Sequence, residues 1–263
     1  MTSLQWKYFV QFKKEFKAQV EKWNEMQELL FPLQRQAAEE SNVPFYPLET
    51  AVVYNNDLKK ISQEDDIKLF VIGDNPGKTE QLKEKNAYLV GQAGKIAENY
   101  FKKNEELKID FRKNAIVLNK TPVHSAKTSN LRYMIKNGGQ EVERLIEESQ
   151  IWMAEKTANL FAALFFACDD ECRRPKLWLV GYSELSVKGL FTKYKETLKK
   201  CCLERGKEVW DNVFVFQHFS MNCFTKDYAR FVKENYNGGE RTLNLMQELC
   251  AIGKKHKDDI FGF

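Results

Sequence analysis

Residues 67–77 read IKLFVIGDNPG, and this stretch decides the fold. Five of the six residues from Ile67 to Ile72 are apolar, and Gly-Asp-Asn-Pro-Gly follows directly. A short apolar run that ends at glycine and proline is typical of a buried strand followed by a tight loop. Ligands bind at the carboxyl ends of the strands in an open parallel sheet. Asp74 and Asn75 are therefore the first polar side chains at a predicted functional edge.

Three further β-rich runs end in the same way. Each is a short apolar stretch followed by polar residues or glycine: Ala115–Leu118, Leu177–Val180 and Val213–Phe216. Helical patterns lie between the runs, among them 93–101 and 139–167. This alternation predicts an α/β fold of three layers, in which helices cover both faces of a four-stranded parallel sheet. The polar residues after the four strands are then expected to line one crevice.

The N-terminal part of the chain predicts a helical addition to this core. Apolar residues between positions 9 and 30 recur at intervals of three and four, which indicates one long amphipathic helix. We expect Pro32 to end or kink this helix, and a loop-rich connector to follow. The chain is accordingly divided into an N-terminal helical extension and connector, 1–66, packed on an α/β domain, 67–263.

Composition limits the class of protein. The 263 residues are 43% hydrophobic and 13% aromatic, which is enough for a sizeable core. A net charge of +4 permits contact with nucleic acid without requiring it, because 41 basic residues stand beside 37 acidic ones. No C-x-x-C pattern occurs among the six cysteines, so we expect reduced thiols in a cytoplasmic protein. No segment has the length and apolarity of a membrane span or a signal peptide.

The loop after the first strand resembles, in part, the phosphate-binding loop of P-loop nucleotide-binding proteins. That pattern needs four residues between its glycines, whereas Gly73 and Gly77 are separated by three. Pro76 also removes one of the backbone N–H groups that would bind phosphate. Asn119-Lys120 looks like the start of a guanine-reading tetrapeptide, but Pro122 stands where that motif needs aspartate. A P-loop protein is therefore the weaker hypothesis.

A second resemblance is carried by motifs at successive strand ends. Gly73-Asp-Asn-Pro-Gly77 with Glu80, followed by VGQAG at 90–94, is similar to the first motif of the uracil-DNA glycosylase superfamily. The nearest branches of that superfamily read GEAPG-x-x-E and G-x-NPG. Asn119, followed by a turn that contains proline, resembles the strand-end asparagine with which the family reads uracil.

The third motif completes the resemblance, which extends over about residues 67–222. Gln217-His-Phe-Ser220 stands where the family has His-Pro-Ser, with phenylalanine in place of proline. Leu89 replaces the phenylalanine that stacks on the base, although Tyr88 beside it can serve instead. No cysteine precedes Cys168, so the ligands that hold an iron–sulfur cluster in the nearest branch are absent.

The resemblance implies a DNA glycosylase that hydrolyses the N-glycosidic bond of uracil or another deaminated base in DNA, with neither a metal nor another cofactor. The catalytic candidates are Asp74, which can accept a proton, Asn75, which can orient water, and His218, which can donate to a base carbonyl. The base-binding candidates are Gly73, Pro76, Gly77, Tyr88, Leu89, Asn119 and Ser220.

Each polar candidate also has an ordinary structural explanation. Asp74 can be a loop or helix-cap aspartate, Asn119 can turn the chain before a proline, and His218 can pack between two phenylalanines. The competing hypothesis is therefore a catalytically degenerate relative that binds nucleic acid or a free base without cleavage. DNA is the expected partner, and the sequence leaves the oligomeric state open.

Four other features of the sequence bear on the same site. Met221 is an apolar candidate for a wedge between bases, and His124 is an outside candidate for the pocket. His256 lies in a lysine-rich tail and is expected to face solvent. The lysines of the segment 193–200 predict a solvated helix face that is also able to contact phosphates.

Overall fold

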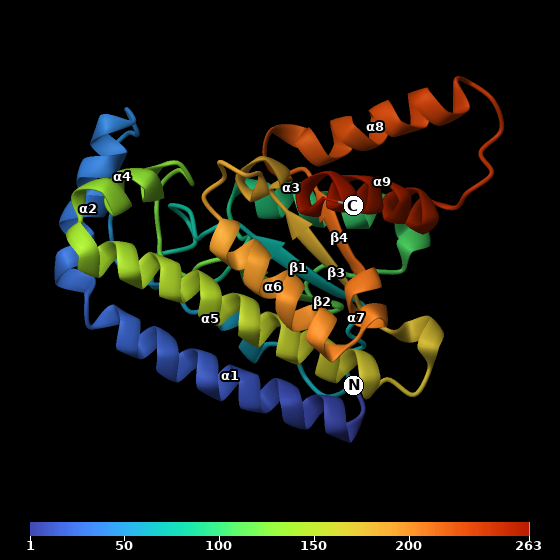
Figure 1. Ribbon diagram of the computed structural model, residues 1–263, viewed down its shortest axis with the longest axis horizontal. Coiled ribbons are helices and arrows are strands. Elements are labelled where there is room, and N and C mark those ends of the chain that lie inside the picture. The colour runs from blue at the N-terminus through green and yellow to red at the C-terminus, as the bar shows by residue number, and fades with distance from the viewer. Residues whose placement is uncertain (263) are drawn as a thin grey trace.

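Four short strands form one sheet in which all neighbours are parallel. The computed structural model describes residues 1–262, and its strands have the spatial order β2-β1-β3-β4 (Figure 1). Their bounds are β1 Leu69–Gly73, β2 Ala115–Asn119, β3 Lys176–Val180 and β4 Val213–Phe216. Every strand residue except Lys176 is buried, which explains why the strands are continuous apolar runs. The prediction of an α/β fold with a four-stranded parallel sheet is confirmed.

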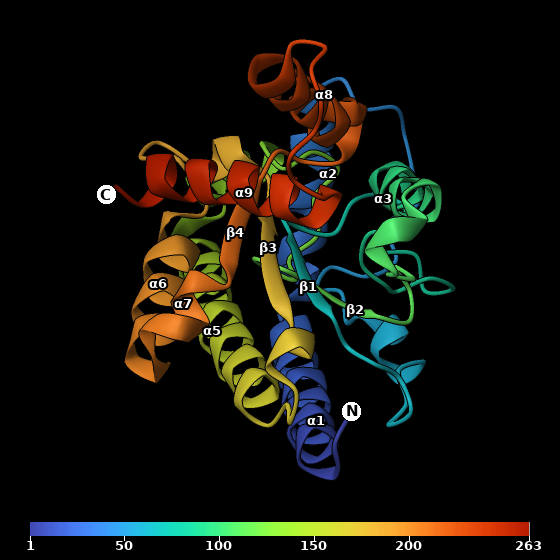
Figure 2. The same ribbon diagram turned by 90° about the vertical axis from the view of Figure 1, so that its right-hand side faces the viewer.

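Helices pack on both faces of this sheet (Figure 2). The helices are α1 Ser3–Asn24, α2 Gln27–Glu40, α3 Gln92–Lys103, α4 Asn130–Asn137, α5 Gly139–Phe166, α6 Thr192–Arg205, α7 Lys207–Asp211, α8 Cys223–Tyr236 and α9 Leu245–Phe261. On one face, Phe161 of α5 meets Phe70 of β1 with ring centroids 5.3 Å apart. On the other face, Phe101 of α3 stacks on Trp178 of β3 at 5.7 Å. Gly253 lets α9 approach the same face, because a Cβ there would lie 2.6 Å from a β4 side chain.

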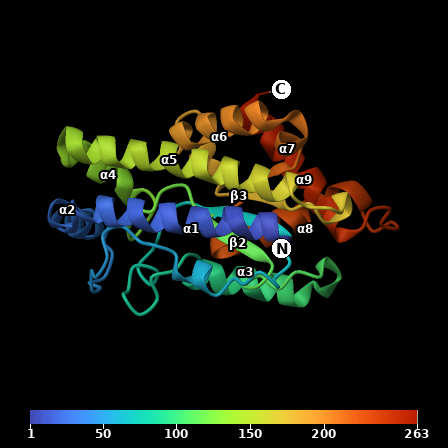
Figure 3. The ribbon, with the colours of Figure 1, turned by 90° about the horizontal axis from the view of Figure 1, so that it is seen from below.

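The N-terminal segment belongs to the same core. α1 lies alongside α5 (Figure 3), and its Phe9, Phe12 and Phe16 are buried in one apolar cluster with the residues of the sheet. Val52, in the connector, forms an antiparallel bridge with Val123 after β2. Among the helices within residues 1–262, none is long and apolar enough to cross a membrane.

The prediction of one helix that runs up to Pro32 is wrong. The helix ends at Asn24, because the side chain of Asn24 pairs with Val52 in both directions, donating to its carbonyl at 2.7 Å and accepting from its N–H at 3.1 Å. A new helix, α2, then contains Pro32. A proline this close to the start of a helix leaves only one carbonyl, that of Glu28, without its N–H partner. The apolar spacing continues across the turn, so periodicity alone does not reveal the break.

The order of the strands creates a crevice between β1 and β3. From β1 the chain continues through α3 to β2 on one side, and from β3 it continues through α6 to β4 on the other side. The loops that follow β1 and β3 therefore diverge. Such a topological switch point is where open α/β sheets bind their ligands.

Candidate functional site

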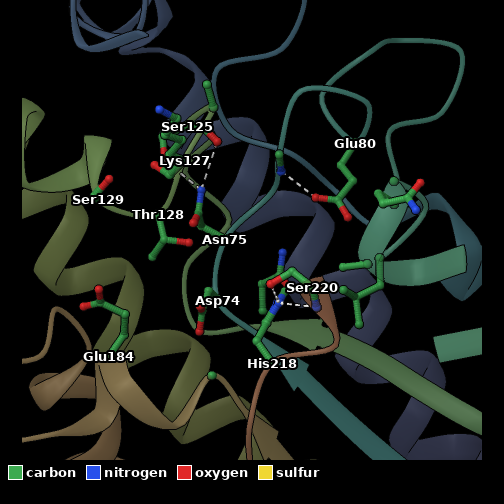
Figure 4. A pocket seen from close by; sticks show the side chains of 18 of the residues that line it. Asp74, Asn75, Glu80, Ser125, Lys127, Thr128, Ser129, Glu184, His218 and Ser220 are labelled. Atoms are coloured by element: carbon green, nitrogen blue, oxygen red, sulfur yellow. Dashed lines mark hydrogen bonds between the residues drawn. The ribbon is translucent and has the colours of Figure 1, made fainter. Parts of the chain in front are cut away.

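A cleft of about 690 Å³ opens at the carboxyl ends of all four strands (Figure 4). Every strand contributes a polar or aromatic side chain to its wall. Asp74 follows β1, Asn119 ends β2, Tyr182 follows β3 and His218 follows β4. The predicted site residues that line this cleft are Asp74, Asn75, Gly77, Leu89, Asn119, His218 and Ser220.

Asp74 is fixed by a buried lysine from the neighbouring strand. Lys120 is fully buried, and its Nζ donates to Asp74 Oδ1 at 2.5 Å and to the carbonyl of Val180 at 2.6 Å. Gly181, with φ of +99°, leaves room for the same carboxylate, because a Cβ there would clash with Asp74 Oδ1. Within residues 1–262, Asp74 Oδ2 has no hydrogen-bond partner and is the oxygen able to act on water or substrate.

The amide of Asn75 is oriented by Ser125. The Ser125 hydroxyl donates to the carbonyl of Lys127 at 2.8 Å, so it can only accept from Asn75 Nδ2, which lies 2.9 Å away. The amide nitrogen therefore faces Ser125, and the side-chain oxygen of Asn75 is left toward the cleft (Figure 4). An oxygen held in this way accepts a hydrogen bond from water and cannot itself take up a proton.

Asn119 lies opposite Gly73 in the parallel ladder. A Cβ at Gly73 would lie 2.5 Å from Asn119 Oδ1, so glycine makes room for the amide rather than contacting a ligand itself. Asn119 is only 2% exposed, and its Nδ2 is buried with no hydrogen-bond acceptor among residues 1–262. An unpaired buried donor costs about 1–3 kcal/mol. A ligand with a carbonyl oxygen at this point removes that cost.

His218 is held as a neutral donor by Ser220. The backbone N–H of Ser220 donates to His218 Nδ1 at 3.1 Å, and the Ser220 hydroxyl lies 2.8 Å from the same nitrogen. Nδ1 is therefore an acceptor, and the proton of the neutral ring is on Nε2. Burial lowers the pKa of His218, although the carboxylate of Asp74 acts in the opposite direction. At neutral pH the imidazole is uncharged, and Nε2–H is available as a donor in the cleft.

Glu80 fastens the loop after β1 to the start of α3. Its buried carboxylate accepts a hydrogen bond from the Gly77 N–H at 2.5 Å and also interacts with the N–H groups of Leu89, Val90 and Gly91. Burial raises the pKa of Glu80, while these backbone donors lower it. The N–H of Gly77, which would face a phosphate in a P-loop, is thus directed at a carboxylate of the protein itself.

Three of the predicted base-binding residues do not line the cleft: Gly73, Pro76 and Tyr88. Tyr88 is fully buried, and its hydroxyl donates to the Val53 carbonyl at 2.7 Å, so the expectation that Tyr88 stacks on a base is wrong. The backbone explains this placement, because Leu89 has φ of +49° and its side chain takes the place at the cleft wall. Pro76 is also buried, and its carbonyl accepts a hydrogen bond from His124 Nδ1 at 2.9 Å.

The other two histidines are structural. His124 is fully buried between Pro76 and Tyr46, whose hydroxyl lies 2.9 Å from His124 Nε2, and burial lowers the pKa of His124 to about 4. His124 thus supports the loop after β1 from behind. The expectation that His256 faces solvent is wrong, since it is 7% exposed. Its ring packs on Tyr182 at 4.9 Å, and its Nε2 lies 3.5 Å from an Asp227 carboxylate oxygen.

The surroundings of the cleft account for the remaining predictions. Phe219, which replaces the family proline, is fully buried and stacks on Phe224 at 4.8 Å. Met221 is 78% exposed beside the cleft and has φ of +55°. In the lysine-rich helix α6, Lys195 donates to the carbonyl of Ile260 in α9, so it interacts with the end of a helix within the protein.

Comparison with known proteins gives no match to this chain, whether with family models, with curated proteins or with solved structures. The site therefore has to be interpreted from its own geometry. Three of its components were missed in the sequence: Lys120, Ser125 and Tyr182. Lys120 follows Asn119 directly, and Tyr182 follows the third strand, so their position after apolar runs was the signal available for both.

Proposed function

We propose that this protein is a DNA glycosylase that hydrolyses the N-glycosidic bond of uracil or another deaminated base. The observation that carries the proposal is the convergence of a carboxylate, two side-chain amides and a neutral imidazole on one cleft. The unpaired Asn119 Nδ2 favours a ligand with a carbonyl oxygen, which deamination creates in a base. The resemblance of the strand-end motifs to the uracil-DNA glycosylase superfamily supports the same assignment.

In the proposed reaction the base enters the cleft after leaving the DNA stack. Asn119 binds the edge of the base through its amide, and His218 Nε2–H donates to the base carbonyl next to the glycosidic nitrogen. The C1′–N bond breaks with its electron pair going to the base, so the base becomes anionic and the sugar cationic. Asn75 orients a water molecule, which bonds to C1′. Asp74 stabilises the sugar cation and takes up the proton that this water loses.

The strongest single contribution is expected from His218. A donor directed at the atom where negative charge develops is worth about 2.7–4 kcal/mol, equivalent to about 10²–10³ in kcat. A neutral imidazole can donate without a change in its protonation state, which agrees with the lowered pKa of His218. Protonation of His218 at Nδ1 breaks the hydrogen bond from the Ser220 backbone N–H, so activity is expected to fall in acid.

Excision assays test this proposal directly. Single- and double-stranded oligonucleotides that contain uracil, hypoxanthine or xanthine are incubated with the protein, and abasic sites are detected by alkaline cleavage. We expect cleavage at one or more of these bases, and loss of cleavage in Asn119→Ala and His218→Ala. Asn159→Ala is the control, because Asn159 is exposed on α5 and does not line the cleft. No cleavage of any substrate by the wild-type protein contradicts the enzymatic function.

DNA is the proposed partner because exposed lysines stand at the rim of the cleft. Lys78, in the loop after β1, and Lys127, in the loop after β2, both line it. Met221 is exposed and lies in the chain between Ser220 and Cys223, which both line the cleft, and this supports a role for its apolar side chain as a wedge between bases. Binding of an oligonucleotide should weaken as the salt concentration increases. The slope of the logarithm of the binding constant against the logarithm of the salt concentration should be smaller in Lys78→Ala than in the wild type.

A catalytically inactive binder of bases or nucleic acid is the second candidate. The observation that favours it is the burial of Tyr88, which leaves no aromatic ring from that loop to hold the base. This candidate predicts saturable binding of free uracil or an oligonucleotide that depends on Asn119, together with no cleavage. A P-loop function has less support, because Glu80 already occupies the Gly77 N–H. It predicts binding of ATP or GTP that depends on Mg²⁺.

A further inference from the structure

One buried charge lies directly behind the cleft, and it supports an inference that rests on the proposed function. We propose that Lys120 is a positioning residue of the reaction, which fixes the Asp74 carboxylate and joins the carboxyl ends of β1, β2 and β3 into one rigid frame. Lys120 does not line the cleft and touches no substrate, so it acts through Asp74.

The contacts of the ammonium group support this role. Lys120 itself follows β2, and its acceptors are the Asp74 carboxylate at 2.5 Å, the Val180 carbonyl at 2.6 Å and the Gly73 carbonyl at 3.4 Å. Two of these acceptors belong to the end of β1, and the third belongs to β3. The ammonium group has three hydrogens, and three acceptors surround it, so no donor remains for a ligand. The ring of Phe191 lies 5.1 Å from the same nitrogen.

The position of Asp74 depends on this contact. Lys120 engages Oδ1, and Gly181 leaves space for the same end of the carboxylate. Oδ2 is the oxygen left without a partner among residues 1–262, so the carboxylate has one orientation relative to the cleft. Without the ammonium group, no cation among residues 1–262 holds Asp74, and the carboxylate can change its orientation in the cleft. A displacement of about 1 Å in a catalytic group can cost about 100-fold in rate.

The same charge acts on His218. Lys120 lowers the pKa of His218 and Asp74 raises it, and these are the two charged groups that face the imidazole, from the ends of β2 and β1. Glu184, from the loop after β3, faces Lys120 and is paired with Arg132. Removal of the Lys120 charge leaves Asp74 unopposed, so the pKa of His218 should rise. This shift can be measured without any enzymatic activity.

The experiment compares the wild-type protein with Lys120→Met and Lys257→Met. Lys257 is the matched control, because it is also buried and also donates to a backbone carbonyl, but lies against Trp210 away from the cleft. We expect Lys120→Met to lower kcat about 100-fold with little change in KM, and to shift the acid limb of the pH profile to higher pH. Lys257→Met should retain the wild-type kcat and profile. A Lys120→Met protein with wild-type kcat and an unchanged profile overturns the inference.

Histidine NMR separates this inference from the proposed function. The titration midpoint of His218 should move to higher pH in Lys120→Met and stay unchanged in Lys257→Met. If the wild-type protein cleaves nothing, the proposed function fails. The role of Lys120 is still tested in that case, because an unchanged His218 midpoint in Lys120→Met refutes it. If Lys120→Met does not fold, Lys120→Gln replaces it in both measurements, because glutamine can still donate to a backbone carbonyl but carries no charge. An unchanged His218 midpoint in Lys120→Gln overturns the inference.

Discussion

His124 makes the stability of this protein dependent on pH in a way that can be calculated. Its pKa is about 4 in the folded protein, because the ring is fully buried, and about 6.5 in the unfolded chain. As the pH falls below 6.5, the unfolded chain binds a proton that the folded protein does not bind, and the free energy of unfolding decreases. The decrease attributable to His124 is about 2 kcal/mol at pH 5 and about 3 kcal/mol at pH 4, and it is absent above pH 7.

The substitution His124→Asn tests this calculation. Asparagine can still donate to the Pro76 carbonyl but does not titrate. We expect a variant that is less stable at pH 7, through lost packing, but loses about 2 kcal/mol less than the wild type between pH 7 and pH 5. Urea unfolding at a series of pH values measures both quantities. Tyr46→Phe is the control, since it removes the hydroxyl next to Nε2 and keeps the imidazole. Parallel pH curves for His124→Asn and the wild type refute the reasoning.

Three further predictions concern the cleft. Gly181→Ala should lower kcat by at least about tenfold in excision assays, because a Cβ clashes with the Asp74 carboxylate and φ of +99° disfavours alanine. A Gly181→Ala variant with the wild-type kcat would show that the position of Asp74 is unimportant. Asn119→Ala should abolish base binding. Thermal unfolding should show no loss of stability in this variant, because the substitution removes the unpaired Nδ2. A strong loss of stability would mean that the amide is paired in the free protein. Met221→Gly should raise the free energy of unfolding by about 0.5–1 kcal/mol, because glycine adopts the left-handed backbone without strain. The same substitution should weaken DNA binding if the side chain is a wedge. Unchanged stability contradicts the first expectation, and unchanged DNA binding contradicts the second.

The strands and their polar ends could be predicted from the sequence because the signal is local. Each strand is an uninterrupted apolar run, and Asp74, Asn119 and His218 stand at or directly after such runs. In a parallel sheet the ends of all strands lie at one edge, so proximity follows from topology alone. This is why residues far apart in the chain could be assigned to one crevice without knowledge of the order of the strands.

The partners of these residues could not be predicted, because they depend on tertiary contacts. Lysine is almost never fully buried without a partner, and nothing near Lys120 in the sequence identifies Asp74, 46 residues earlier, as that partner. The direction of the Tyr88 side chain depends on the positive φ of Leu89. A positive φ at leucine cannot be predicted from the sequence. The turn after Asn24 depends on Val52, in a connector that has no regular pattern.

His256 is different, because the sequence did contain the signal. Leu249, Ile252, His256 and Ile260 are spaced by three, four and four residues, which is one face of a helix. All four are buried where α9 covers the sheet. The lysines around His256 belong mainly to the opposite, solvated face, so overall composition was misleading where periodicity was informative.

The pairing of Gly73 with Asn119 has a consequence for how ligands of this protein can be found. The amide that faces the proposed base is placed by the register of two strands, so the binding site comes into existence only when the sheet has assembled. A ligand of that site binds the native chain and not the unfolded one, and by mass action it must raise the temperature of unfolding. At a free concentration of 100 times its dissociation constant, such a compound adds about 2.7 kcal/mol to the free energy of unfolding. Melting curves recorded with a panel of free bases can thus rank candidate substrates before any reaction is known.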